Sequence, residues 1–313
     1  MRSAIEVHGL TKVYPGGVEA VKGLDFDVAR GEVFGMLGPN GAGKSTTIGM
    51  LTTTIAPTSG SARVGGFDVA LHPISARRVS SVVFQDAVVD RALTGRRNLN
   101  IHARLWGVEM ASAEGRIAEL ADRFAMGDLL DRPVGTYSGG ERRRLEIARS
   151  LVSQPEVLFL DEPTVGLDPR IRFELLDVIS GLRDRAEMTI VLTTHYLDEA
   201  ERLCDRVAIV HEGRIVALDA PRNLLSELGR EIVELRVEND APSALAALRA
   251  HGVADDDAFL VGSTVTVPLH EASARDTIGV VADLGLATAA ISSRAPTLDD
   301  VYLRYTGSRL GAA

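Results

Sequence analysis

Residues 33–46 read Val-Phe-Gly-Met-Leu-Gly-Pro-Asn-Gly-Ala-Gly-Lys-Ser-Thr. The apolar start, residues 33–37, predicts a buried strand, and the rest matches the pattern GxxxxGK[ST] directly before a helical run at 46–51. In such a loop the backbone N–H groups and the helix N-terminus attract phosphates, Lys44 reaches the β- and γ-phosphates, and Ser45 offers a hydroxyl to Mg²⁺. The predicted nucleotide ligands are Gly38, Pro39, Asn40, Gly41, Ala42, Gly43, Lys44, Ser45 and Thr46.

A second apolar run, residues 157–160, leads into the acidic pair Asp161 and Glu162. If this run is a buried strand, it delivers both carboxylates to its carboxyl end beside the loop at 38–46. There Asp161 can hold the Mg²⁺ shell, directly or through water, and Glu162 can polarise a water for in-line attack on the γ-phosphate. Two acidic residues that merely solvate a strand end are the alternative, which the nearby glycine loop disfavours.

The segment Tyr-Ser-Gly-Gly-Glu-Arg at 137–142 precedes this acidic pair. Ser138, Gly139 and Gly140 are expected to open a helix over 141–152 and to expose N–H donors and a hydroxyl at its positive end. The segment therefore predicts a second phosphate-binding surface. Without the other motifs, the same residues would be only a helix cap, and 142–144 a solvated helix face.

In this order, the motifs resemble those of ABC-type ATPases, whose signature is usually LSGGQ; Tyr137 and Glu141 depart from that form. The resemblance implies further site residues by position. Gln85 corresponds to the glutamine that touches Mg²⁺ or attacking water, and Asp168 to the D-loop aspartate. His195 corresponds to the histidine that contacts the γ-phosphate, and Tyr14 to the aromatic that stacks on adenine.

The resemblance also implies roles and partners. The expected catalytic residues are Glu162, His195 and Lys44, and the expected magnesium ligands are Ser45, Gln85 and Asp161, with ATP and Mg²⁺ as cofactors. A homodimer is implied, because in this family the signature of one subunit closes on the ATP held by the other. A membrane permease encoded as a separate chain is the further implied partner.

Over the whole length, the chain resembles the daunorubicin-resistance type of exporter ATPase, including the acidic extension that ends Pro-Thr-Leu-Asp-Asp-Val-Tyr-Leu at 296–303. The function implied is ATP-driven efflux of a drug, an antibiotic or another hydrophobic compound. The alternatives are an ATPase of another ABC system, for lipid or polysaccharide export or for import, and a soluble ABC ATPase that acts on nucleic acid or ribosomes.

Composition limits the remaining choices. The 313 residues are 45% hydrophobic and 25% charged, with a formal charge of −9, which argues against a basic nucleic-acid-binding face. The single cysteine, Cys204, cannot form an internal disulfide and favours a reducing compartment. Since no apolar run approaches the ~20 residues of a membrane span, a membrane role requires a partner. We expect a peripheral protein on the cytoplasmic side of a bacterial membrane.

The predicted fold class is α/β, a P-loop NTPase of the ABC ATPase type with a mixed sheet core, an antiparallel β subdomain and a helical subdomain. The expected ATPase domain spans 4–225, with the helical subdomain at 85–153. In the remaining residues, 226–313, the strand and helix patterns follow the order β-α-β-β-α-β. That order predicts a small α+β domain of the ferredoxin-like kind.

Overall fold

The centre of the molecule is a six-stranded sheet in the order β10-β9-β3-β8-β7-β6. This computed structural model describes residues 3–86, 88–186, 188–238 and 240–307. Neighbouring strands run parallel except β9 and β10, which are antiparallel. The strands are β3 (Val33–Leu37), β6 (Ser80–Val83), β7 (Val157–Asp161), β8 (Thr189–Thr194), β9 (Arg206–His211) and β10 (Arg214–Asp219). Every residue of β3, β7 and β8 is buried, as expected of strands covered on both faces.

One face of this sheet is covered by a second, antiparallel sheet in the order β2-β1-β4-β5 and by two helices. These elements are β1 (Ser3–Tyr14), β2 (Val18–Ala29), β4 (Ser59–Val64), β5 (Phe67–Asp68), α1 (Lys44–Leu51) and α2 (Pro73–Val79). Ile5 from β1, Ile48 from α1, and Phe34 and Phe159 from the central sheet share one buried cluster. This apolar layer fixes α1 against the sheet and so holds the loop that precedes it.

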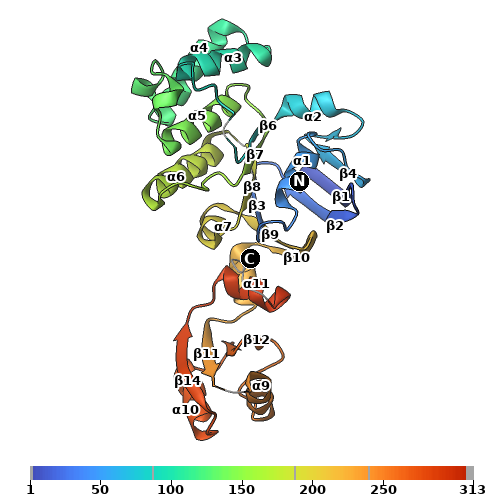
Figure 1. The fold of residues 1–313 in the computed structure, drawn as a ribbon, viewed down its shortest axis with the longest axis vertical. Helices are drawn as coiled ribbons and strands as arrows, with labels where there is room; N and C mark the ends of the chain where they lie inside the picture. Colours follow the sequence, from blue (N-terminus) through green and yellow to red (C-terminus); the bar gives the residue numbers. More distant parts are fainter. Residues whose placement is uncertain (1–2, 87, 187, 239, 308–313) are drawn as a thin grey trace.

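Helices pack on the opposite face and extend away from it (Figure 1). They are α3 (Gly95–Leu105), α4 (Met110–Arg123), α5 (Gly139–Leu151), α6 (Pro169–Ala186) and α7 (Leu197–Leu203), with single 3₁₀ turns η1 (Gly127–Leu129) and η2 (Val134–Thr136). The expected apolar faces are buried: Ile117, Phe124, Leu145 and Ala148 join one cluster with Leu158 of the central sheet. The mixed sheet, antiparallel sheet and helices confirm the predicted fold class.

A third sheet lies at the end of the molecule away from α3 and α4 (Figure 1), with strand order β12-β13-β11-β14 and antiparallel pairing throughout. It follows α8 (Pro221–Ser226) and is built from β11 (Glu231–Val237), α9 (Ala241–Ala250), β12 (Phe259–Val261), β13 (Thr264–Leu269), α10 (Ala274–Asp283) and β14 (Thr288–Arg294). The β-α-β-β-α-β order matches the ferredoxin-like expectation.

The last helix, α11 (Leu298–Thr306), was not anticipated from the sequence. It returns from the third sheet and packs against α7, α8 and β10, where Tyr302 is buried in the same cluster as the central helices. The Tyr302 hydroxyl lies 2.7 Å from Nδ1 of His211 at the end of β9. On the other side, Arg294 of β14 donates to both carboxylate oxygens of Asp300 at 2.7 Å. The helix therefore ties the third sheet to the central one.

No helix in the described ranges is long and apolar enough to span a bilayer.

Candidate nucleotide site

The glycine loop joins the carboxyl end of β3 to the start of α1, and close backbone packing requires glycine at two of its positions. At Gly43, φ is +104°, and a Cβ would lie 2.4 Å from the carbonyl oxygen of Ala20. At Gly38, a Cβ would lie 2.2 Å from the carbonyl oxygen of Val210. Neighbouring strands thus shape the loop, and any side chain at these positions would displace it.

Lys44 points back over this loop. Its Nζ donates to the carbonyl oxygens of Gly38 at 2.7 Å and Pro39 at 3.0 Å, and the side chain is only 4% exposed. Burial lowers the pKa of Lys44, while the nearby Glu162 carboxylate opposes that shift. The ammonium group is consequently held by neutral carbonyl oxygens and one carboxylate. A phosphate oxygen can serve as a further acceptor.

Asp161 ends β7 beside the loop, where hydroxyl groups surround its carboxylate. Oδ1 of Asp161 accepts hydrogen bonds from Ser45 Oγ at 3.0 Å and from Thr193 Oγ1 at 2.6 Å. Carboxylate and hydroxyl oxygens are the hard donors that Mg²⁺ prefers. The Ser45 and Asp161 pair therefore fits a magnesium ion bound with a nucleotide. No cluster of three or more potential metal-ligating side chains of His, Cys, Asp or Glu occurs elsewhere in the described parts of the chain.

Glu162 follows in the left-handed region, with φ of +46°, and its side chain is buried. Its carboxylate lies 3.5 Å from Lys44 Nζ through Oε1 and 3.4 Å from His195 Nδ1 through Oε2. Its backbone N–H donates to Thr193 Oγ1 at 3.0 Å. The structure thus brings Lys44, Glu162 and His195 together, although they are far apart in sequence.

A cavity of about 400 Å³ is lined by Lys44 and Glu162, whereas His195 and Asp161 are not among its described lining residues. Its walls come from the loop residues 40–46, from Gln85 and Glu162, and from Tyr14, Val18 and Ala20 at the edge of the antiparallel sheet. Tyr14 is half-buried, and its hydroxyl lies 3.3 Å from Thr46 Oγ1. The cavity thus combines a phosphate-binding loop, two polar side chains and an aromatic ring at its rim.

The signature segment lies outside this cavity. Ser138 and Gly139 are exposed, Gly140 is buried, and none of the three lines the cavity among the described residues. Ser138 caps α5: its Oγ accepts from the Glu141 N–H at 3.2 Å, and its own N–H donates to Glu141 Oε2 at 2.7 Å. Asp168 is also exposed, and its Oδ1 accepts from the Ile171 N–H at 3.1 Å.

Two residues that hold the site together, Thr193 and Arg143, are not among those predicted from the sequence. Thr193 bonds both Asp161 and the Glu162 backbone, and the parallel register that pairs Asp161 with Thr193 is the signal that points to it. Arg143, within the stretch that resembles a solvated helix face, is buried behind the carboxylates. Its burial has no signal in local sequence, because arginines flank it on both sides.

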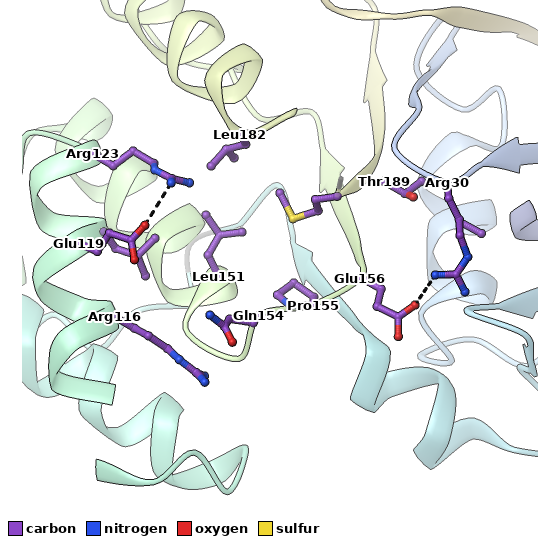
Figure 2. A pocket seen from close by; sticks show the side chains of 13 residues that line it. Arg30, Arg116, Glu119, Arg123, Leu151, Gln154, Pro155, Glu156, Leu182 and Thr189 are labelled. Atoms are coloured by element: carbon purple, nitrogen blue, oxygen red, sulfur yellow. Dashed lines mark hydrogen bonds and ion pairs between the residues drawn. The ribbon is translucent and has the colours of Figure 1, made fainter. Parts of the chain in front are cut away.

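A larger cavity, of about 670 Å³, lies elsewhere, between α4, the end of α5, α6 and the starts of the central strands (Figure 2). Ion pairs engage charged groups on its walls: Arg30 with Glu156 at 2.9 Å, and Arg123 with Glu119 at 3.3 Å. No residue of the predicted nucleotide site lines it, within the part of the chain that the structure describes. Volume alone is therefore a poor guide to the site in this molecule.

The fold and the glycine loop define a P-loop nucleotide-binding protein, in which the loop lysine lies close to a strand-end carboxylate and that carboxylate lies close to a histidine. Residues 21–165 match the family model described as ABC transporter. The chain is 46% identical to the daunorubicin/doxorubicin resistance ATP-binding protein of Streptomyces peucetius, over 97% of this chain and 92% of that protein. The chain belongs to the ABC transporter family of ATP-binding proteins, and it is an ATPase.

Other relatives extend the same likeness. The Nod factor export ATP-binding protein I of Ralstonia nicotianae is 38% identical, over 98% of this chain and 94% of that protein. Among solved structures, CbiO1 from Clostridium perfringens, described as part of the ABC transporter complex CbiONQ, matches with a TM-score of 0.67 and 29% identity. That match covers 72% of this chain and 92% of CbiO1. The resemblance to ABC-type ATPases is thereby confirmed.

Proposed function

We propose that this ATPase powers efflux of a drug, an antibiotic or a similar hydrophobic compound through a separately encoded membrane permease. The observation that carries the proposal is 46% identity, over nearly the whole of both chains, to a protein named for daunorubicin and doxorubicin resistance. Export of another class of compound is the second candidate, because a relative named for Nod factor export is also 38% identical over nearly the whole chain.

Within the proposed site, each residue has a distinct task. The loop N–H groups and Lys44 bind the phosphates, and Ser45, Gln85 and Asp161 hold the magnesium shell. Bound Mg²⁺ neutralises charge on the phosphate oxygens. Glu162 accepts a proton from the attacking water, and its buried carboxylate beside His195 keeps that water in line. His195 contacts the γ-phosphate, and Tyr14 stacks on the adenine ring.

We propose that the site is completed by a second copy of the chain. Ser138 and Gly139, followed by the buried Gly140, form a helix start that does not line the cavity in the described part of the chain, so the exposed end of α5 can meet another molecule. In a head-to-tail dimer, this surface of one subunit would meet the γ-phosphate bound by the other, with Asp168 beside it. Two ATP molecules would then lie in the interface.

The permease is proposed to dock on the helices that follow Gln85. Three apolar side chains there are exposed: Val88, three residues after Gln85, and Ile101 and Leu105 on α3, of which Leu105 is 79% exposed. An exposed apolar patch is typical of an interaction surface. We infer peripheral attachment to the cytoplasmic side of a membrane by this contact, and we propose 4–225 as the ATPase domain, with 85–153 its docking subdomain and 226–313 an accessory domain.

The catalytic assignment is tested by Glu162→Gln, which keeps the size of the side chain but removes its basicity. ATP binding should persist, hydrolysis should fall by roughly 100-fold or more, and ATP-bound dimers should accumulate on a sizing column. Glu156→Gln, on the far edge of the sheet, is the matched control and should hydrolyse ATP at the parental rate. A Glu162→Gln protein as active as its parent would refute the proposed base.

Transport is tested in cells that express the chain with a membrane protein that co-purifies with it. Cells with the parental chain should accumulate less of a fluorescent anthracycline than cells with Glu162→Gln, and Leu105→Glu should abolish co-purification while the isolated protein still hydrolyses ATP. Equal accumulation in the first two strains, with hydrolysis intact, would remove drug efflux and leave the second candidate to be tested with lipid-linked sugars.

A further inference from the structure

Arg143 on α5 is a buried guanidinium whose hydrogen bonds converge on the catalytic strand end. The side chain is 7% exposed. Nε donates to the carbonyl oxygen of Pro163 at 2.7 Å, and Nη2 donates to the carbonyl oxygens of Asp161 at 3.1 Å and Glu162 at 3.3 Å. One side chain therefore bonds the carbonyl groups of three consecutive residues, 161–163. Two of these residues carry the proposed catalytic carboxylates.

The other terminal nitrogen holds the segment that leads to Gln85. Nη1 of Arg143 donates to the carbonyl oxygen of Phe84 at 2.5 Å and to Glu146 Oε2 at 3.1 Å. The second oxygen of Glu146, itself buried, accepts from the Val88 N–H at 2.9 Å. The five N–H donors of the guanidinium thus have five acceptors. Arg143 bonds Phe84 and Glu146 bonds Val88, so the pair contacts the chain on both sides of Gln85.

The backbone of Glu162 requires such a restraint. A non-glycine residue at φ of +46° lies in a sparsely populated region and persists there only where the surroundings enforce it. Thr193 holds the N–H of Glu162, and Arg143 holds its carbonyl oxygen. The carboxylate direction, toward Lys44 and His195, follows from this fixed backbone.

We infer that Arg143 is a positioning residue for ATP hydrolysis: it sets the direction of Glu162 through the backbone of 161–163. The inference rests on the proposed role of Glu162 as the base. Because the acceptors are carbonyl oxygens in different directions, the planar fork of arginine meets them all, whereas the compact ammonium of lysine reaches only some.

Arg143→Lys is the direct test, since it keeps a positive charge beside the buried Glu146 carboxylate and so limits the damage to folding. We expect kcat to fall roughly 10- to 100-fold, with KM for ATP within about threefold of the parental value. Arg144→Lys, the same exchange one position along the helix, is the matched control. Arg144 pairs with Glu174 on α6 at 2.5 Å and touches neither carboxylate segment, so its kcat should stay near parental.

A double variant separates positioning from general damage. In the Glu162→Gln background the base is absent, so adding Arg143→Lys should cause no further fall in residual hydrolysis, and ATP-bound dimers should still accumulate. Parental kcat in Arg143→Lys, a parallel loss of ATP binding and melting temperature, or a further 10-fold fall in the double variant would each overturn the inference. If Arg143→Lys fails to fold, Arg143→Gln with Glu146→Gln keeps the buried pair neutral and is read the same way.

The two assignments fail in different ways. If Glu162→Gln hydrolyses ATP at the parental rate, the proposed base falls and the role of Arg143 falls with it. If Glu162→Gln is inactive while Arg143→Lys is fully active, only the role of Arg143 is wrong.

Discussion

The strand end at Asp161 and Glu162 and the signature segment at 138–140 are built in opposite ways. The two carboxylates are buried. Ser45 and Thr193 donate to the Asp161 carboxylate, and Arg143 donates to the backbone carbonyl oxygen of Glu162. Ser138 and Gly139 are exposed, and the hydroxyl and N–H of Ser138 form the local capping box with Glu141. One region is rigidly organised within a single chain, while the other presents its helix start to the surroundings.

This difference indicates how the work is divided between two subunits. A preorganised strand end can bind nucleotide before any partner arrives, because its groups are already oriented. An exposed helix start gains a phosphate partner only when another molecule closes over it. Variants of the phosphate-binding loop and strand end should therefore affect nucleotide binding, whereas variants of the signature segment should affect hydrolysis alone. The following changes test that separation.

Glycine replacements should give the largest contrast. Gly43→Ala places a Cβ 2.4 Å from the Ala20 carbonyl oxygen at a φ of +104°, so the loop must move and ATP affinity should fall by more than about 100-fold. In Gly139→Ala the nearest atom to the new Cβ is Leu167 Cδ2 at 3.7 Å, an ordinary contact. That variant should bind ATP like its parent. Titration with a fluorescent ATP analogue measures both; similar losses in the two variants would contradict the division.

Thr193→Val should give the next largest effect. Valine has the same shape but removes the hydrogen bond to Asp161 and the acceptor for the Glu162 N–H, so kcat should fall on the order of 10- to 100-fold. Thr189→Val, at the other end of β8, is the matched control, because its hydroxyl accepts from the Gly31 N–H at 3.0 Å, away from Asp161 and Glu162. Steady-state hydrolysis should be near parental in the control, and equal activity in both variants would make the Thr193 bonds irrelevant to catalysis.

Sequence alone predicts the fold because its decisive signals are local. The glycine loop between an apolar run and a helix, and the apolar runs at 157–160 and 189–193, identify a buried parallel sheet without any long-range information. The helix α11 escaped prediction for the opposite reason. Five of its nine residues are buried, and their packing against α7, α8 and β10 depends on tertiary contacts rather than on local sequence.

The residues of the candidate site also divide into those with a local sequence signal and those placed by tertiary packing. The residues in the glycine loop, in the acidic pair and at His195 occupy recognisable motifs, and their side chains converge in the structure. Thr193 and Arg143 form hydrogen bonds with segments that are distant in sequence, so these contacts depend on tertiary packing. An arginine between two arginines has the composition of a solvated face, and only the structure reveals that the middle one is buried.

Ser138→Ala should give a smaller effect that is confined to hydrolysis. Loss of the cap costs about 1 kcal/mol of stability, and loss of one hydroxyl donor to a charged phosphate should lower kcat on the order of 10-fold, with ATP binding by the isolated subunit unchanged. Ser273→Ala removes an equivalent cap on α10, where Oγ accepts from the Asp276 N–H at 3.2 Å. The control should lose similar stability but no activity; a matching loss of activity would assign both effects to stability.

The smallest expected effect is a pH dependence of the free energy of unfolding, which should arise in the helical block rather than at the strand end. His102 lies on α3, in the helical block that carries the signature, and burial together with the nearby Arg149 lowers its pKa to about 4. The unfolded histidine titrates near 6.5, so between about pH 6.5 and 4 the unfolded chain binds more protons and stability falls as the pH falls.

Because His102 is only partly buried, we expect a loss of about 1 kcal/mol between pH 7 and pH 5, discounted for screening by solvent. His102→Gln should remove this pH-dependent part. Urea unfolding at both pH values measures the difference, and hydrogen exchange should locate it in α3 rather than in β3. An identical pH dependence in the parental chain and in His102→Gln would exclude His102 as its source.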